Sequence, residues 1–195
     1  ATIFMEADLH KIAAHKRKKE PAGYHLTYTL YLSVAAIAAL KTYPGVNAYW
    51  DEAGIARNDD VNIGFLVSQW ENKVLVPVIR AFDKLSLRGM IDALGRMSEY
   101  IQEGSIPEDE CGGETFTIAN QGKGGALFST PLLEPKRGVI FGVGAIHKKP
   151  VVVENDALAV HPVVNLSLTY DLRVLNNFAA NRFLARLKDV LETWV

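Results

Sequence analysis

Apolar residues recur along the chain with two different periods, and the period separates predicted helices from predicted strands. Steps of three and four between residues 85 and 104 predict an amphipathic helix that ends at Gly104. Residues 29–42 are apolar nearly all round, which predicts a deeply buried helix that stops at the following proline and glycine. Asp8 is a plausible N-cap for a shorter helix near the N-terminus.

The last helix is predicted to begin near Asn176, a residue whose side chain can cap a helix. Its apolar stripe is expected to comprise Phe178, Phe183, Leu184, Leu187, Leu191 and Trp194. Beta-branched or alternating runs predict strands around Tyr49 and over 2–7, 61–67, 74–79, 115–119, 138–146, 151–153 and 163–170. Strands and helices interleave irregularly, so we expect one α/β domain, residues 1–195, in which helices pack on a sheet.

Composition narrows the classes of partner. The net charge of −1 does not favour nucleic acid or an anionic membrane surface as a binding partner. No apolar run reaches the roughly 18 residues of a membrane helix. The single cysteine, Cys111, excludes an internal disulfide and suits a reducing compartment, either the cytoplasm or the mitochondrial matrix. Cys111 has no neighbouring base in the sequence, so it is not expected to be a nucleophile.

Three weaker features support no chemistry. The glycine-rich loop 120–125 lacks the spacing of a phosphate-binding loop and precedes no helix. Histidines at positions 10, 15, 25, 147 and 161 show no metal-ligand spacing, so no metal site is predicted. The basic run 15–19 is expected to be an exposed helix end, with phosphate contact as the alternative.

Two segments carry a family resemblance. The first, near the C-terminus, is Leu166-Ser-Leu-Thr-Tyr-Asp-Leu-Arg-Val-Leu-Asn-Asn177, and the second is Gly112-Gly-Glu-Thr-Phe-Thr-Ile-Ala-Asn-Gln-Gly122. They resemble the stretches Ser-Leu-Ser-Tyr-Asp-His-Arg-Val and Gly-Gly-Thr-Phe-Thr-Ile-Ser-Asn of the dihydrolipoamide acyltransferases, the core subunits of 2-oxo acid dehydrogenase complexes. Further matches run in order from about residue 43 to residue 184, so the resemblance covers most of the chain.

The resemblance implies a chloramphenicol-acetyltransferase-like two-layer sandwich of mixed sheet and helices that forms a homotrimer. Its active site is expected in a channel between neighbouring subunits, where an acyl group passes between dihydrolipoamide and coenzyme A. In that reaction a histidine takes the proton of the attacking thiol, whose reference pKa of about 8.5 leaves little thiolate at neutral pH. A serine hydroxyl donates to the oxyanion of the tetrahedral intermediate.

Two of these chemical positions have changed in this chain. The resemblance places the base at Leu172 and the oxyanion hydroxyl at Ala119, and neither side chain can perform that step. It places the asparagine that follows the base at Asn176, a residue that the family allows. Asp171 and Arg173, which flank the missing histidine, are retained, and we expect them to form a structural ion pair that holds the turn.

The favoured hypothesis is therefore a non-catalytic core subunit, similar to component X of pyruvate dehydrogenase complexes. Such a subunit requires no cofactor, although coenzyme A or a lipoyl arm stays open as a residual ligand. Its expected partners are further copies of itself and other subunits of a 2-oxo acid dehydrogenase complex. The N-terminal arm and the apolar C-terminal tail usual in the family are expected to be missing.

The alternative hypothesis is an active acyltransferase that uses an unusual base. The candidate is His161, which lies on the same predicted strand as the family motif. Leu172 is eleven residues further on, roughly 35 Å along an extended chain. His161 is therefore expected at the opposite end of the strand from Leu172.

Overall fold

A mixed β-sheet forms the centre of the computed structural model, which describes residues 1–20, 26–68 and 74–195. Along the sheet the strands lie in the order β1 (Thr2–Asp8), β11 (Leu158–Tyr170), β9 (Val139–Val143), β8 (Phe116–Asn120), β4 (Ile63–Phe65) and β7 (Val78–Ile79), and β10 (His147–Val152) pairs with β11. β11 is antiparallel to β1 and β9, whereas β8 is parallel to β9 and β4. Two small antiparallel pairs join β2 (Ala48–Asp51) to β3 (Gly54–Arg57) and β5 (Val67–Ser68) to β6 (Val74–Leu75).

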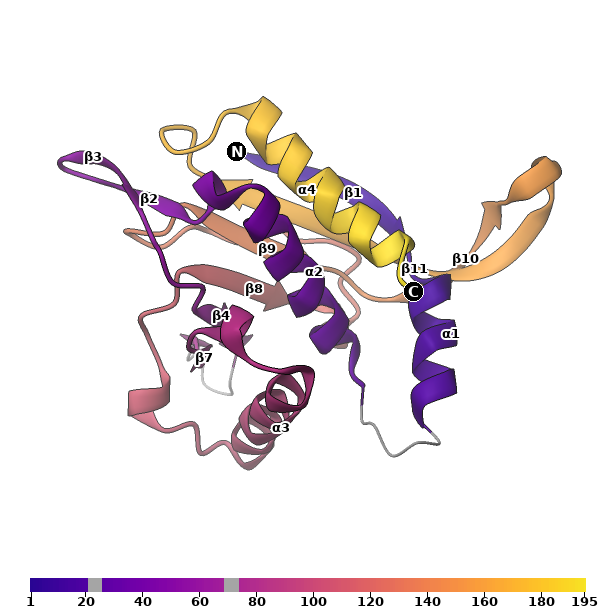
Figure 1. The fold of residues 1–195 in the computed structure, drawn as a ribbon, viewed down its shortest axis with the longest axis horizontal. Coiled ribbons are helices and arrows are strands. Elements are labelled where there is room, and N and C mark those ends of the chain that lie inside the picture. The colour runs from indigo at the N-terminus through magenta and orange to yellow at the C-terminus, as the bar shows by residue number, and fades with distance from the viewer. Residues whose placement is uncertain (21–25, 69–73) are drawn as a thin grey trace.

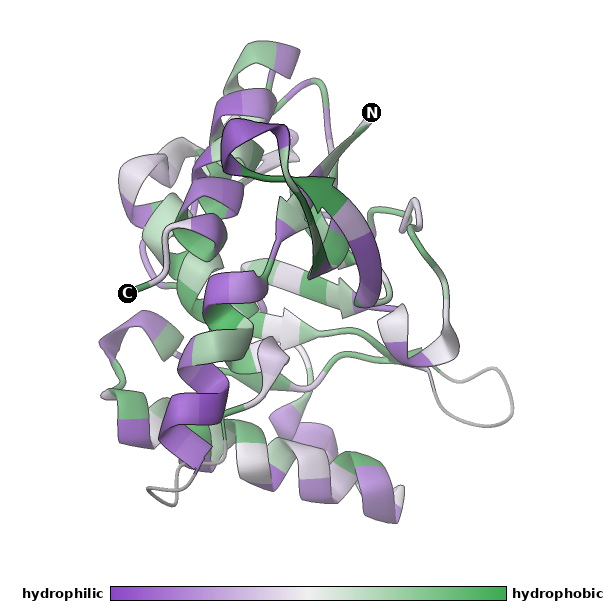
Figure 2. Ribbon diagram, turned by 90° about the vertical axis from the view of Figure 1, so that its right-hand side faces the viewer, coloured by the Kyte–Doolittle hydropathy of each residue, from purple (hydrophilic) through white to green (hydrophobic). Residues whose placement is uncertain are grey.

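The helices α2 (Tyr28–Thr42) and α4 (Asn177–Glu192) lie side by side on one face of the sheet (Figure 1). Alternate residues of β11 face them, and Val164, Leu166, Leu168 and Tyr170 are all buried there. The helices α1 (His10–Lys19) and α3 (Leu87–Glu103) lie toward opposite sides of α2. Figure 2 shows green, apolar stretches in strands of the sheet and a mixture of purple and green residues along several helices.

Helix ends follow the predicted capping residues, with one exception. Asn176 caps α4, and Gly104 ends α3 in the left-handed region at φ 68°, both as predicted; Ser86, which was not predicted as a cap, caps the start of α3. The prediction for Asp8 is off by one residue, because Leu9 is the N-cap of α1. The Asp8 carboxylate still accepts the backbone N–H of His10 at 2.8 Å, so it performs the capping role from one position earlier.

The predicted apolar stripe of the last helix is wrong at its first member. Phe178 is 69% exposed, whereas Phe183, Leu184, Leu187 and Leu191 are fully buried. The guanidinium of Arg182, one turn along α4, lies over the Phe178 ring at 5.5 Å. Phe178 precedes the fully buried Ala180 by two residues, so the helical repeat places it on the outer face of α4.

Two strand predictions also change. β11 begins at Leu158, five residues before the predicted start, and with β10 it forms a two-stranded ribbon that extends beyond the helices (Figure 1). The predicted strands 61–67 and 74–79 are each broken in two. Glu71 and Asn72, whose polar side chains predict a turn between these strands, lie outside the described residues. Short 3-10 turns connect elements at Pro44–Val46, Phe82–Lys84, Glu108–Glu110, Gly122–Gly124 and Glu154–Asp156. A search of the described residues for a helix long and apolar enough to cross a bilayer finds none.

Candidate active-site region

The family motif forms a tight turn between β11 and α4. The backbone N–H of Asp171 donates to the carbonyl of Gly138 at 2.9 Å, which ties the turn to the start of β9. The backbone N–H groups of Val174 and Leu175 both donate to the Asp171 carbonyl at 2.9 Å. Leu172, the position that the resemblance assigns to the base, lies within this turn and is 62% exposed, so its side chain projects from the surface of the chain.

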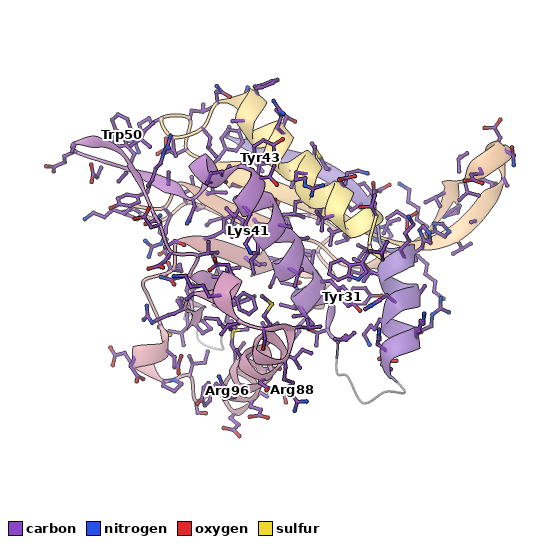
Figure 3. All side chains as sticks on the ribbon, in the orientation of Figure 1. Tyr31, Lys41, Tyr43, Trp50, Arg88 and Arg96 are labelled. Carbon is purple, nitrogen blue, oxygen red and sulfur yellow. The ribbon has the colours of Figure 1, made fainter. Side chains whose placement is uncertain are left out.

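Asp171 and Arg173 form the predicted ion pair. Arg173 Nη2 lies 2.6 Å from Asp171 Oδ2, and its Nε lies 3.1 Å from both carboxylate oxygens. The hydrogen bonds from Arg173 lower the pKa of the Asp171 carboxyl below its ordinary value. The same guanidinium lies 5.4 Å from the centre of the Trp50 ring, on the β2–β3 hairpin (Figure 3). The pair therefore links the turn to this hairpin as well as closing it.

Asn176 and Asn177 are engaged in holding the start of α4. The Asn176 side chain accepts the N–H of Ala179 at 2.8 Å as the helix cap. The Asn177 side chain accepts the Tyr170 hydroxyl at 2.8 Å, which joins the end of β11 to the first residue of the helix. The side-chain oxygens of Asn176 and Asn177 therefore both accept hydrogen bonds that hold the start of α4 in place.

Ala119 lies on the opposite face of the sheet from the helices. It is fully buried in β8 and pairs with Gly142, which in turn pairs with Ser167 of β11. A Cβ on Gly142 would lie only 2.1 Å from Ser167 Oγ and 3.7 Å from Pro131, so this face is narrow and is covered by the loop after β8. The Ser167 hydroxyl is buried without a hydrogen-bond partner among the described residues.

One chain does not bring the two family positions together. Ala119 lies on β8, and β9 separates it from Ser167, the residue level with it on β11. Leu172 lies five residues beyond Ser167 along the chain. Strands about 4.8 Å apart and a rise of about 3.4 Å per residue put them roughly 20 Å apart. At this separation, the side chains of Ala119 and Leu172 in one chain do not reach the same reacting group.

The described histidines are far from Leu172 along the sheet. His161 lies near the start of β11, whereas Leu172 lies two residues beyond its end, as the strand spacing predicts. The fold does, however, correct the expectation that no histidine–carboxylate cluster exists. Ligand atoms of Asp8, His10 and His161 all lie within 4.8 Å of one another. Sequence spacing could not reveal this group, because pairing of β1 with β11 brings residues 8 and 161 together.

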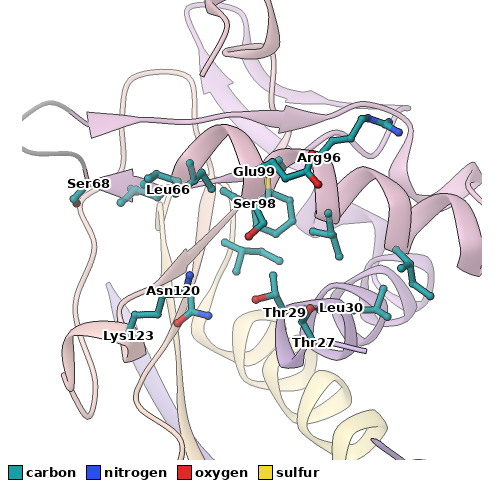
Figure 4. Close-up of a pocket in the computed structure, with 18 of the residues that line it drawn as sticks. Thr27, Thr29, Leu30, Leu66, Ser68, Arg96, Ser98, Glu99, Asn120 and Lys123 are labelled. Atoms are coloured by element: carbon teal, nitrogen blue, oxygen red, sulfur yellow. Dashed lines mark hydrogen bonds between the residues drawn. The ribbon is translucent and has the colours of Figure 1, made fainter. Parts of the chain in front are cut away.

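A cavity of about 900 Å³ opens between α3, the start of α2 and the end of β8 (Figure 4). Thr29, Ser98 and Asn120 point toward it from three elements, among mainly apolar neighbours. Its volume lies within the range of small-molecule sites. Ile118 and Asn120 line the cavity, so Ala119, between them on the strand, faces the other side of the sheet. No motif signals this cavity, since its lining residues are scattered along the sequence.

Cys111 is not an activated thiol. Partial burial, followed by the nearby carboxylates of Glu108, Glu110 and Glu114, raises the pKa of its thiol above the ordinary value. A raised pKa keeps the sulfur protonated at neutral pH.

This arrangement of sheet and helices defines an acyltransferase-like α/β sandwich. A chloramphenicol acetyltransferase structure superposes with a TM-score of 0.59 at 14% identity, over 98% of this chain and 87% of that one, which is a likeness of fold alone. The dihydrolipoamide acetyltransferase of Azotobacter vinelandii superposes with a TM-score of 0.86 at 32% identity, over 99% and 81%. A truncated catalytic core of the 2-oxoacid dehydrogenase complex from Thermoplasma acidophilum gives 0.86 at 27% identity, over 99% and 86%.

The family model for the catalytic domain of 2-oxoacid dehydrogenase acyltransferases matches residues 1–195, and the chain belongs to this family. A Mycobacterium bovis protein, the dihydrolipoyllysine-residue acetyltransferase component of the pyruvate dehydrogenase complex, is 38% identical over 96% of this chain. The lipoamide acyltransferase component of the branched-chain alpha-keto acid dehydrogenase complex of Bacillus subtilis is 32% identical over 99%. The chain spans 36% and 46% of these two proteins, respectively.

Proposed function

We propose that this chain is a non-catalytic acyltransferase-like core domain with a structural or partner-binding role in a 2-oxo acid dehydrogenase complex of the pyruvate type. The observation that carries the proposal is Leu172, at the family's base position. Its side chain is 62% exposed on a turn whose polar neighbours are already hydrogen-bonded to one another or to the backbone. Loss of a general base typically lowers the rate by about 10²–10⁴.

A second position supports the same proposal. The Azotobacter vinelandii structure concerns the roles of a serine, a histidine and an asparagine in the catalytic mechanism of that enzyme. Its histidine and asparagine stand four positions apart, as Leu172 and Asn176 do here. Ala119, at the serine position, offers no hydroxyl, and removing one oxyanion donor typically costs about 10²–10³ in rate. Only the asparagine is retained, and here it caps α4.

The proposal extends to assembly and location. Because Ala119 and Leu172 lie far apart in one chain, a homotrimer is the arrangement that would bring the two family positions together across a subunit boundary. Other subunits of the complex are the remaining partners, and the mitochondrial matrix or the cytoplasm is the proposed location. No cofactor is required for this role. Coenzyme A or a lipoyl arm remains a possible residual ligand, which titration calorimetry would detect.

The test compares acetyl transfer from acetyl-coenzyme A to dihydrolipoamide in the wild type, the Leu172→His/Ala119→Ser variant and a control. Leu132→His is a matched control, because it places a histidine at another exposed leucine, 87% exposed, without touching the motif. We expect the wild type and the control to remain at the uncatalysed rate. The double variant should gain activity, because it restores both the proton acceptor and the oxyanion donor.

The second candidate function is an active acyltransferase with an unusual base, and family membership is what favours it. Wild-type turnover equal to that of an active family member assayed in parallel would establish this alternative and refute the proposal. Sedimentation of the same preparations would measure the assembly mass. A monomeric mass would contradict the proposed trimer independently of the activity result.

A further inference from the structure

A compact group of two imidazoles and one carboxylate lies at the end of the sheet remote from Leu172. Asp8 is the last residue of β1, His10 is the first residue of α1, and His161 lies near the start of β11. The Asp8 carboxylate contacts both rings, with Oδ1 3.1 Å from His10 Nδ1 and Oδ2 2.6 Å from His161 Nδ1. The two rings are stacked, with centres 4.3 Å apart and planes 23° apart.

The backbone fixes this group from both sides. Asp8 pairs with Val163 in the antiparallel register of β1 and β11, and the N–H of Leu9 donates to the Pro162 carbonyl at 2.8 Å. The His10 N–H donates to Asp8 Oδ1, which sets the direction in which α1 starts. Two segments more than 150 residues apart in sequence are therefore held together by main-chain contacts, with the three side chains next to one another.

We propose that Asp8, His10 and His161 form a binding site for a divalent transition-metal ion of the zinc type. Imidazole nitrogen and carboxylate oxygen are ligands that zinc binds at about 2.0–2.2 Å, with a tetrahedral arrangement preferred. Such an arrangement places ligand atoms roughly 3.3 Å apart. The three ligand atoms already lie within 4.8 Å of one another, and the two contacts to Asp8 are 3.1 and 2.6 Å. Metal binding would displace the protons that these contacts share.

The residues around Asp8, His10 and His161 leave these three side chains accessible to a metal ion. Lys149, opposite His161 on β10, directs its ammonium to Glu6 at 2.8 and 3.0 Å, so a carboxylate already neutralises it. The Asp8 side chain is 26% exposed, His161 is 17% and His10 is 43%. The site is thus open to solvent on the His10 side, where a water molecule can complete the four ligands. A bound ion would connect the start of α1 to β11.

The test uses the whole chain after removal of metal with a chelator. Calorimetric titration with zinc chloride is expected to give one ion per chain, and thermal unfolding should shift upward with zinc because the ion binds the folded state. Magnesium chloride at the same concentration should produce neither effect, since magnesium prefers oxygen ligands. His10→Gln and His161→Gln should each weaken zinc binding at least about tenfold, the lower end of the loss seen when a ligand's supporting partner is removed.

His147→Gln is the matched control. His147 lies on β10, and its Nδ1 is 3.2 Å from the carbonyl of Ala145, outside the three-residue group. Its zinc affinity should equal that of the wild type. The more exposed His10 keeps the test decisive if His161→Gln fails to fold. The absence of zinc binding by the wild type would reduce the group to a hydrogen-bonded cluster and overturn the proposal. Unchanged affinity in His10→Gln would overturn it equally.

Discussion

The two ends of β11 contain similar kinds of residue but use them differently. At the C-terminal end, Asp171, Arg173 and Asn176 surround the exposed Leu172, and each is hydrogen-bonded within the turn or to the start of α4. At the N-terminal end, His161 meets Asp8 and His10, with ligand-type atoms facing one another. The imidazole that the family motif requires is absent from the first end, whereas two imidazoles gather at the second.

This contrast separates the framework of a motif from its chemistry. Asp171, Arg173 and Asn176 have structural partners in this chain, so their presence follows from the need to form the turn and cap the helix. The base position has no such duty, because the side chain of Leu172 projects from the surface. The residues that hold the turn are therefore distinct from Leu172, the position that the resemblance assigns to the base.

The largest loss of stability is expected from a substitution in the buried face of α4, the helix that follows Leu172. Phe183→Ala should lower the free energy of unfolding by about 3–5 kcal/mol, because the ring is fully buried against Phe116 and the sheet. Phe178→Ala, the same substitution on the same helix at a ring that is 69% exposed, should change it far less. Urea unfolding of both variants measures the difference. Equal losses would mean that Phe178 is buried after all, as the sequence pattern predicts.

A smaller effect is expected where the turn passes into α4. Asn176→Ala removes the side-chain acceptor of the Ala179 N–H and should cost about 1 kcal/mol of stability. Asn181→Ala is the control, because the side chain of this exposed asparagine donates only to the Asn177 carbonyl within the same helix. Urea midpoints of the two variants and the wild type give the comparison. A neutral Asn176→Ala would show that the helix start is held by Tyr170 and Asn177 alone.

The smallest effect is expected from the ion pair, and it should depend on pH. Hydrogen bonds from Arg173 lower the folded-state pKa of Asp171 below its ordinary value of 3.8, so the folded chain binds this proton less tightly than the unfolded chain. The stabilisation is present above that ordinary value and disappears as the pH falls through the folded-state pKa. Asp171→Asn should therefore be slightly less stable than wild type at pH 7.

The two proteins should converge in stability once the Asp171 carboxyl of the wild type is protonated. Denaturant midpoints measured between pH 7 and pH 2.5 would follow this convergence. A difference between the variant and the wild type that stays constant over the whole range would show that the substituted amide disturbs the turn for reasons other than charge. In that case the contact with Arg173 would not be the source of the lowered pKa.

Much of the fold could be predicted from the sequence because local patterns carry it. The cap at Asn176, the left-handed Gly104 and the buried helix over 28–42 follow from side-chain chemistry within a few residues. One error arose from a contact distant in sequence, because β11 extends to Leu158 where β10 pairs with it. The error at Phe178 is one of helical phase, since the buried residues Ala180 and Leu187 lie on the opposite face of α4.

The sequence by itself indicated the family and the residues of the turn, and the resemblance assigns the positions of the base and the hydroxyl to Leu172 and Ala119. The tertiary structure decided which residues distant in sequence lie next to one another. Pairing of β1 with β11 brings Asp8 and His10 to His161, and pairing of β8 through β9 with β11 keeps Ala119 away from Leu172. The physical reason is that strand register, set by the burial of one face of the sheet, connects residues that no local pattern relates.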